Sequence, residues 1–187
     1  AHLKVSTLRI VASALLACTA FPAASLGDPA PALALTSSVT APVHPDIPVV
    51  LLVDMSSGQT LYSREPNRRF VPASVTKVMT AYTAFRLLGE GKLSSNTPVT
   101  VSKEVAELWS GEGSSMFLQA GDVVTVGQLL LGVTTVSAND GAVVLSLAAG
   151  GTQDGWLKMM NENAAQLGMR DTHFGTPNGC CSQCFFM

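Results

Sequence analysis

Ser74 and Lys77 have the side chains and the spacing of a nucleophile and its base, in the segment Ser74-Val75-Thr76-Lys77. Three residues are close to one helical turn, so a helix places both side chains on one face. A serine in the first turn also meets the positive end of the helix dipole. A neighbouring amine accepts the hydroxyl proton if burial lowers its pKa. The pair therefore suits acyl transfer. The alternative is a helix-capping Ser74 and a solvent-exposed Lys77, since this spacing arises by chance about once in such a chain.

A second polar motif, Ser137-Ala138-Asn139, is expected between two helices further along the chain. Alone it is weak, because Ser94-Ser95-Asn96 has the same form and is expected to be a turn. The alternative for Ser137 is a helix N-cap. An ordered pair of motifs, Ser-x-x-Lys at a helix start and then Ser-x-Asn between helices, is typical of penicillin-recognising serine enzymes.

Other chemistries have little support. The sequence contains no Gly-x-Ser-x-Gly, no His-Glu-x-x-His and no glycine-rich phosphate loop. A Ser-His-Asp triad would depend on His173, because the other histidines are His2 and His44. Zinc needs about four ligands, and the cluster Cys180, Cys181 and Cys184 contains one Cys-x-x-Cys pair without a second, so we expect no metal and no cofactor. The formal net charge of −2 without a basic block argues against nucleic acid as a partner.

The pattern of apolar residues predicts an α+β domain. A buried strand is expected at 49–53, a turn at 56–58 and a returning strand at 59–62. A helix follows Pro72, with apolar positions at helical spacing, and ends at Gly89 or Gly91. A short strand is expected at 97–101, the segment 122–126 leads into a helix at 127–133, and further helices are expected at 103–109, 141–149 and 153–168. The helices must position both polar motifs.

Residues 1–25 are expected to be an export signal. Lys4 and Arg9 precede a short apolar run, and small residues suited to cleavage follow. Acylation at Cys18, as in bacterial lipoproteins, stays open as an alternative. Residues 26–46 are rich in Ala and Pro and are expected to be a linker. Residues 47–179 are expected to be the N-terminal portion of a catalytic domain, and 180–187 an aberrant Cys-rich tail.

The stretch from Val50 to Gly179 resembles the serine-type D-alanyl-D-alanine carboxypeptidases, the low-molecular-mass penicillin-binding proteins of the transpeptidase/β-lactamase-like superfamily. The most specific match is Pro72-Ala73-Ser74-Val75-Thr76-Lys77-Val78-Met79-Thr80. Further matches are Asp54-Met55-Ser56-Ser57-Gly58, Ser137-Ala138-Asn139-Asp140-Gly141, Met160-Asn161-Glu162-Asn163 and Thr172-His173-Phe174.

The resemblance implies a transpeptidase-like fold with the site between a sheet edge and a helical lobe. It implies that Ser74 attacks the penultimate D-Ala carbonyl of a peptidoglycan stem peptide, with Lys77 as proton acceptor. Ser137 would relay a proton to the leaving group, and Asn139 would hold the substrate amide and orient Lys77. Penicillins and other β-lactams would acylate Ser74. The implied location is the periplasm or cell envelope, and peripheral membrane association is left open.

The sequence departs from the family pattern in two places. No lysine is followed by Thr-Gly, although the family has a Lys-Thr-Gly motif on a strand beside the site. Thr176 stands where the family usually has Asn before Pro-x-Gly. Because the resemblance stops after Gly179, we expect a C-terminally truncated chain in which the remaining strands are missing. Such a chain is expected to fold poorly or to have little carboxypeptidase activity, since two strands alone are marginal.

Three other functions compete with this interpretation. A serine β-lactamase shares both motifs, but the only Glu after Ser137 is Glu162, inside an expected helix. A non-catalytic remnant that binds penicillin or peptidoglycan is the second alternative. An exported structural protein with chance motifs is the third, and the long match around Ser74 makes it the weakest.

Overall fold

The computed structural model describes residues 43–180. The expected export signal at 1–25, nearly all of the linker at 26–46 and all but the first residue of the tail at 180–187 lie outside the described residues. Between residues 43 and 180, no helix combines the length and apolarity needed to cross a bilayer.

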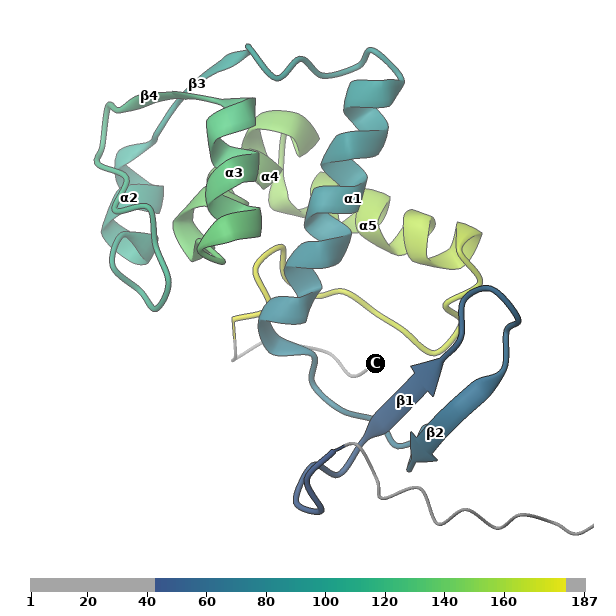
Figure 1. Ribbon diagram of the computed structural model, residues 1–187. Coiled ribbons are helices and arrows are strands. Elements are labelled where there is room, and N and C mark those ends of the chain that lie inside the picture. The colour runs from purple at the N-terminus through teal and green to yellow at the C-terminus, as the bar shows by residue number, and fades with distance from the viewer. Residues whose placement is uncertain (1–42, 181–187) are drawn as a thin grey trace, which may run out of the picture. The chain divides into compact units, whose positions relative to one another are not determined.

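An antiparallel hairpin opens the described part of the chain (Figure 1). It consists of β1 (Val50–Val53) and β2 (Thr60–Arg64), with Val50 opposite Arg64 and Leu52 opposite Tyr62. The hairpin was predicted, but the prediction that β1 is buried is wrong, because Leu51 is 59% exposed. Among the described strands β1 pairs only with β2, so its β-branched and leucine side chains lack a covering layer.

The first long helix begins in a tighter turn. A 3₁₀ helix (Ala73–Val75) leads directly into α1 (Thr76–Gly89), close to the predicted bounds. The buried face of α1 carries small and polar side chains together with Met79. Most of the apolar stripe that predicted the helix is instead exposed, at Val75, Val78, Tyr82 and Phe85.

Four further helices form the core with α1 (Figure 1): α2 (Lys103–Trp109), α3 (Val126–Thr135), α4 (Asn139–Gly150) and α5 (Gln153–Gln166). The helix α4 contacts each of the others and is buried on all sides from Asn139 to Ser146. Its residues are apolar nearly all round, as expected for a central helix. The largest fully buried side chains include Trp156, Leu129 and Leu145.

Short elements close the helix ends. The strands β3 (Pro98–Thr100) and β4 (Val123–Thr125) pair antiparallel, as a second two-stranded sheet. Thr125 caps α3 in a capping box, in which its side chain accepts from the Gln128 amide and the Gln128 side chain accepts from the Thr125 amide. The fold is thus α+β, as predicted.

The segment after α5 has no regular structure and returns to α1 (Figure 1). Phe174, Pro177 and Asn178 are buried in it. The Asn161 side chain on α5 binds both the amide and the carbonyl of Phe174, at 2.9 Å each. This segment therefore belongs to the packed domain.

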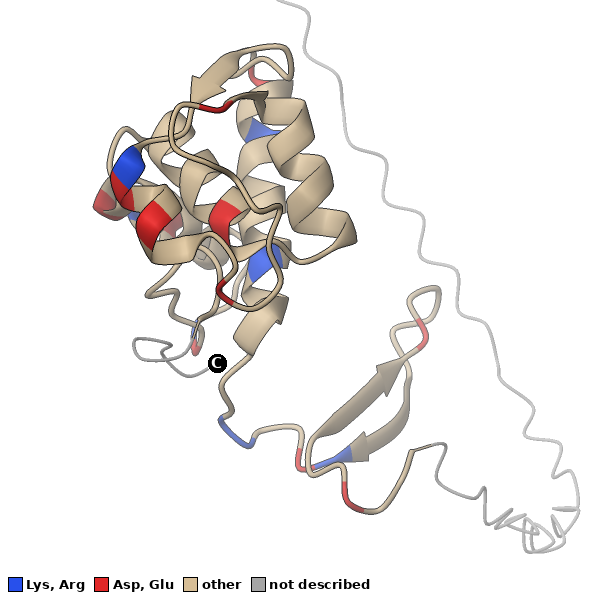
Figure 2. Ribbon diagram, turned by 90° about the vertical axis from the view of Figure 1, so that its left-hand side faces the viewer, with Lys and Arg blue, Asp and Glu red and all other residues tan. Residues whose placement is uncertain are grey.

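Both Lys or Arg positions and Asp or Glu positions are spread along the described part of the chain (Figure 2). Several form exposed pairs one helical turn apart, such as Lys103 with Glu107 and Lys158 with Glu162.

Candidate active site

Ser74 and Lys77 lie side by side at the start of α1. The Lys77 Nζ donates to Ser74 Oγ at 3.0 Å, which confirms the shared helix face that their spacing predicts. Ser74 is exposed, whereas Lys77 is only 4% exposed. The alternative of a capping serine and a solvated lysine is wrong, because neither the 3₁₀ helix nor α1 has a side-chain N-cap and Lys77 is buried.

A backbone carbonyl from the far end of the described chain also holds Lys77. The Nζ donates to the Asn178 carbonyl at 2.7 Å. One helical turn further along α1, Thr80 Oγ1 donates to the Pro177 carbonyl at 2.6 Å. Two adjacent carbonyls of the segment after α5 are therefore tied to α1, and they fix the position of the amine.

The turn that presents these carbonyls requires a glycine. Gly179 has a φ of +71°, and a Cβ there would lie 1.8 Å from the Ala73 carbonyl oxygen. Ala73, directly before the serine, itself has a φ of +48°. A non-glycine residue in the left-handed region is strained and is kept there only by its surroundings. The tight approach of the two segments thus sets the backbone that carries Ser74.

Thr176 closes the same turn. Its Oγ1 accepts a hydrogen bond from the Gly179 amide at 3.0 Å, and the residue is buried. The threonine that departs from the family pattern therefore has a structural function in this chain. Sequence reasoning did not identify Asn178 as part of the site, because its contact is made by a backbone carbonyl. The only signal was the Pro-x-Gly pattern around it.

Ser137 lies in the same groove as Ser74 and Lys77. These three residues, together with side chains from α1 and α3, line a groove with a volume of about 480 Å³. The walls between them are apolar and include Val78, Tyr82, Phe85 and Val133. Ser137 has a φ of +59° and lies in the short connection between α3 and α4. The alternative that Ser137 is a helix N-cap is wrong, because Ala138 occupies the N-cap of α4.

Asn139 begins α4, two residues earlier than predicted, and it is buried. Its Nδ2 donates to the Glu112 carbonyl and its backbone amide donates to the Ser114 carbonyl, both at 2.8 Å. The described residues that line the groove do not include Asn139. The structure thus brings Ser74, Lys77 and Ser137 into one groove, whereas Asn139 is tied to the carbonyls of a loop and does not line that groove.

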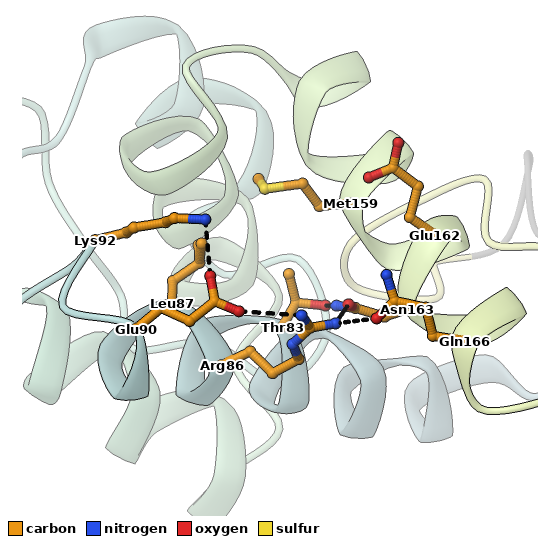
Figure 3. Close-up of a pocket in the computed structure, with 9 residues that line it drawn as sticks. All are labelled: Thr83, Arg86, Leu87, Glu90, Lys92, Met159, Glu162, Asn163 and Gln166. Carbon is orange, nitrogen blue, oxygen red and sulfur yellow. Dashed lines mark hydrogen bonds and ion pairs between the residues drawn. The ribbon is translucent and has the colours of Figure 1, made fainter.

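A second cavity lies between α1 and α5 (Figure 3). It has a volume of about 170 Å³, and its lining includes Arg86, Glu90, Lys92 and Glu162. Arg86 donates to the side chains of Asn163 and Gln166, as the dashed lines show. Hydrogen bonds lower the pKa of the Glu90 carboxyl, and the bond from Lys92 has a larger effect than the bond from Arg86. Glu162 lies here rather than in the Ser74 groove, so it gives the β-lactamase alternative no support.

Metal ligands do not gather in the described region. Between residues 43 and 180, no three His, Cys, Asp or Glu side chains lie close enough to hold an ion. Cys181 and Cys184, which form the Cys-x-x-Cys pair, lie outside the described residues.

Comparison with known proteins gives the family. Residues 38–183 match the family described as D-alanyl-D-alanine carboxypeptidase, peptidase family S11. The chain is 33% identical over 129 residues to D-alanyl-D-alanine carboxypeptidase DacF of Bacillus subtilis, covering 69% of this chain and 32% of that protein. It is 33% identical over 168 residues to DacA of Escherichia coli, covering 87% of this chain and 40% of that protein. The chain thus spans about a third to two fifths of the length of these relatives.

Solved structures agree. D-alanyl-D-alanine carboxypeptidase DacD from Francisella tularensis superimposes with a TM-score of 0.72 at 32% identity, over 79% of this chain and 35% of that one. Penicillin binding protein 5 from Haemophilus influenzae gives a TM-score of 0.67 at 34% identity, over 71% of this chain and 39% of that one. The fold is therefore that of the penicillin-binding proteins, and the chain belongs to the D-alanyl-D-alanine carboxypeptidase family.

Proposed function

We propose that this chain carries the acylation machinery of a serine-type D-Ala-D-Ala carboxypeptidase. One observation carries the proposal: the buried Lys77 amine lies 3.0 Å from the exposed Ser74 hydroxyl. Burial disfavours the charged form of an amine, so more of it is present in the neutral form that can accept a proton. The exposed hydroxyl, in contrast, is accessible to a substrate.

The proposed reaction proceeds through a covalent acyl-enzyme. Ser74 Oγ attacks the carbonyl carbon of the penultimate D-Ala of a stem peptide and gives its proton to the neutral Lys77 amine. The C–N bond to the terminal D-Ala then breaks, and Ser137 relays the proton from Lys77 to the leaving nitrogen, which restores the neutral amine. In the second step the oxygen of a water bonds to the acyl carbon, the ester C–O bond to Ser74 breaks, and a proton from that water goes to Ser74 Oγ. The family resemblance also assigns Asn139 to the substrate amide, although here its Nδ2 donates to the Glu112 carbonyl and it is not among the described residues that line the groove.

The same geometry supports penicillin sensitivity. A β-lactam carbonyl that occupies the place of the penultimate D-Ala carbonyl would be attacked by Ser74, and the ring C–N bond would open. The ring nitrogen stays tethered to the acyl group, so the product is a covalent adduct. By the family relationship and the expected signal at 1–25, the site of action is the periplasm or cell envelope, and the partner is peptidoglycan.

Labelling with a fluorescent penicillin tests the proposal. We expect the unsubstituted chain to take up label and Ser74→Ala to take up none, whereas Ser63→Ala, at an exposed serine of β2, labels normally. Lys77→Ala should lower the labelling rate by at least about a hundredfold, in the range seen for loss of a general base. Ser137→Ala should slow labelling, and Ser94→Ala, in the exposed turn of the same form, should not. Normal labelling of Ser74→Ala would contradict the proposal.

Product analysis separates the alternatives. Release of D-Ala from a stem pentapeptide together with a persistent penicillin adduct identifies a carboxypeptidase. Rapid turnover of penicillin identifies a β-lactamase instead. Binding of a stem peptide without any adduct identifies a non-catalytic binding protein.

A further inference from the structure

A loop lies against the start of α4, where Asn139 is the first helical residue. We call residues 111–118 the strap. Its Glu112 and Ser114 carbonyls accept the two hydrogen bonds of Asn139 described above. Gly113, with a φ of +65°, lies between them, and a Cβ there would come within 3.0 Å of the Asn139 Nδ2. The position of Asn139 therefore depends on the conformation of the strap.

A buried carboxylate fixes the strap. Asp140, the second residue of α4, is 0% exposed. Its Oδ1 accepts from the Met116 amide at 3.0 Å and from the Gly141 amide at 2.8 Å. Its Oδ2 accepts from Ser115 Oγ at 2.7 Å and from the Leu118 amide at 3.1 Å. All four partners are donors, and the two oxygens of a carboxylate can accept from all of them. An asparagine at this position would place its NH₂ group, itself a donor, opposite two of these donors.

The strap needs this support because its own backbone is strained. Phe117 has a φ of +57°, and the residues on both sides of it donate their amides to Asp140. Left-handed backbone at a non-glycine residue is strained and persists only when surrounding contacts impose it. Without the carboxylate, the strap is expected to relax.

The Met116 side chain gives the strap a second attachment. It packs where α3 and α4 both carry a glycine. A Cβ at Gly141 would lie 3.0 Å from the Met116 Sδ, and one at Gly132 would lie closer still. The two glycines thus form a slot for this side chain, and the slot holds the strap in place while the carboxylate sets its backbone.

We propose that Asp140 is a positioning residue for the chemistry of Ser74, and this inference rests on the proposed function. Asp140 holds the strap, the strap carbonyls hold Asn139, and Asn139 orients the substrate amide toward Ser74. Among the described residues that line the Ser74 groove, Asp140 is not included. A small displacement of a positioning group costs up to about a hundredfold in rate.

The substitution Asp140→Asn tests this in the full chain. The matched control is Asp122→Asn, an exposed carboxylate that accepts from the Gln119 amide at 2.8 Å just beyond the strap. With fluorescent penicillin, we expect Asp140→Asn to label about tenfold to a hundredfold more slowly while nearly all molecules are eventually labelled. Asp122→Asn should label at the rate of the unsubstituted chain. An unchanged rate in Asp140→Asn, or a loss confined to the labelled fraction, would mean that the residue only supports folding and would overturn the proposal.

Hydrogen exchange gives a readout that needs no acylation. We expect Asp140→Asn to speed exchange at the Met116 and Leu118 amides and at the Asn139 side-chain amide, and Asp122→Asn to leave all three unchanged. Ser115→Ala removes one of the four bonds and should have an intermediate effect. If the unsubstituted chain takes no label, the proposed function fails, and the exchange rates alone then decide whether Asp140 controls Asn139. Unchanged exchange at the Asn139 side chain overturns the inference.

Discussion

At the residue scale, the Ser74–Lys77 pair was predictable from the sequence, whereas its support was not. A separation of three residues fixes two side chains on one helix face, so the 3.0 Å contact follows from local geometry. The carbonyl that holds Lys77 comes from Asn178. Every residue has a backbone carbonyl, so the residue type at position 178 could not predict this contact. The same holds for the bonds that Asp140 makes to the strap, because two of its partners are backbone amides of that loop.

The close approach of Gly179 to Ala73 gives a prediction at this scale. Gly179→Ala should lower the free energy of unfolding by more than about 2 kcal/mol, because left-handed strain and a clash with the Ala73 carbonyl add together. It should also slow penicillin labelling, since the Asn178 carbonyl moves away from Lys77. Urea denaturation measures the stability.

Gly91→Ala is the matched control for this substitution. Gly91 has a similar φ of +68°, but nothing lies within 4 Å of its Cβ position. Gly91→Ala should lower the free energy of unfolding by about 1 kcal/mol, because only the left-handed backbone conformation is unfavourable there. Equal losses for the two variants would show that the approach to Ala73 is unimportant.

At the element scale, helix positions were predicted better than burial. The helices at 103–109 and 153–168 were found at or near their predicted bounds as α2 and α5. Helix α4 begins earlier than predicted, since the Ser114 carbonyl accepts from the first helical amide and no side-chain cap marks the start. The prediction that β1 is buried was wrong. An apolar run shows that a strand is suited to burial, but burial also requires another part of the protein to pack against it.

The hairpin turn gives a pH prediction at this scale. Hydrogen bonds from the side chain of Ser57, and then from Ser56, lower the pKa of Asp54 from 3.8 to about 2. Since the folded turn favours the charged carboxylate, its contribution to hairpin stability is complete above the unfolded pKa of 3.8 and is lost as the pH falls through about 2. An NMR titration of the Asp54 carboxyl carbon measures this directly.

Removal of the two donors is the control for that titration. In the double variant Ser56→Ala, Ser57→Ala, the midpoint should return toward 3.8. A midpoint near 3.8 in the unsubstituted chain would contradict the hydrogen bonds described for the turn.

At the scale of the whole molecule, the family followed from the order of two short motifs and the long match around Ser74, and the α+β class followed from the predicted hairpin and helices. Each motif alone was weak, and the groove shared by Ser74, Lys77 and Ser137 shows why the pair is informative: residues from α1 and from the α3–α4 connection meet there. The buried position of Asn139 could not be predicted, because it depends on how a loop between distant elements packs.

The central claim is that Ser74 is the nucleophile of this chain, and mapping a penicillin adduct tests it most directly. The unsubstituted protein is incubated with benzylpenicillin, digested and analysed by mass spectrometry. The account predicts one covalent adduct, on the peptide that contains Ser74 and bonded to its Oγ. An adduct on Ser137 or Cys180 instead, or no adduct on the folded protein, would contradict it.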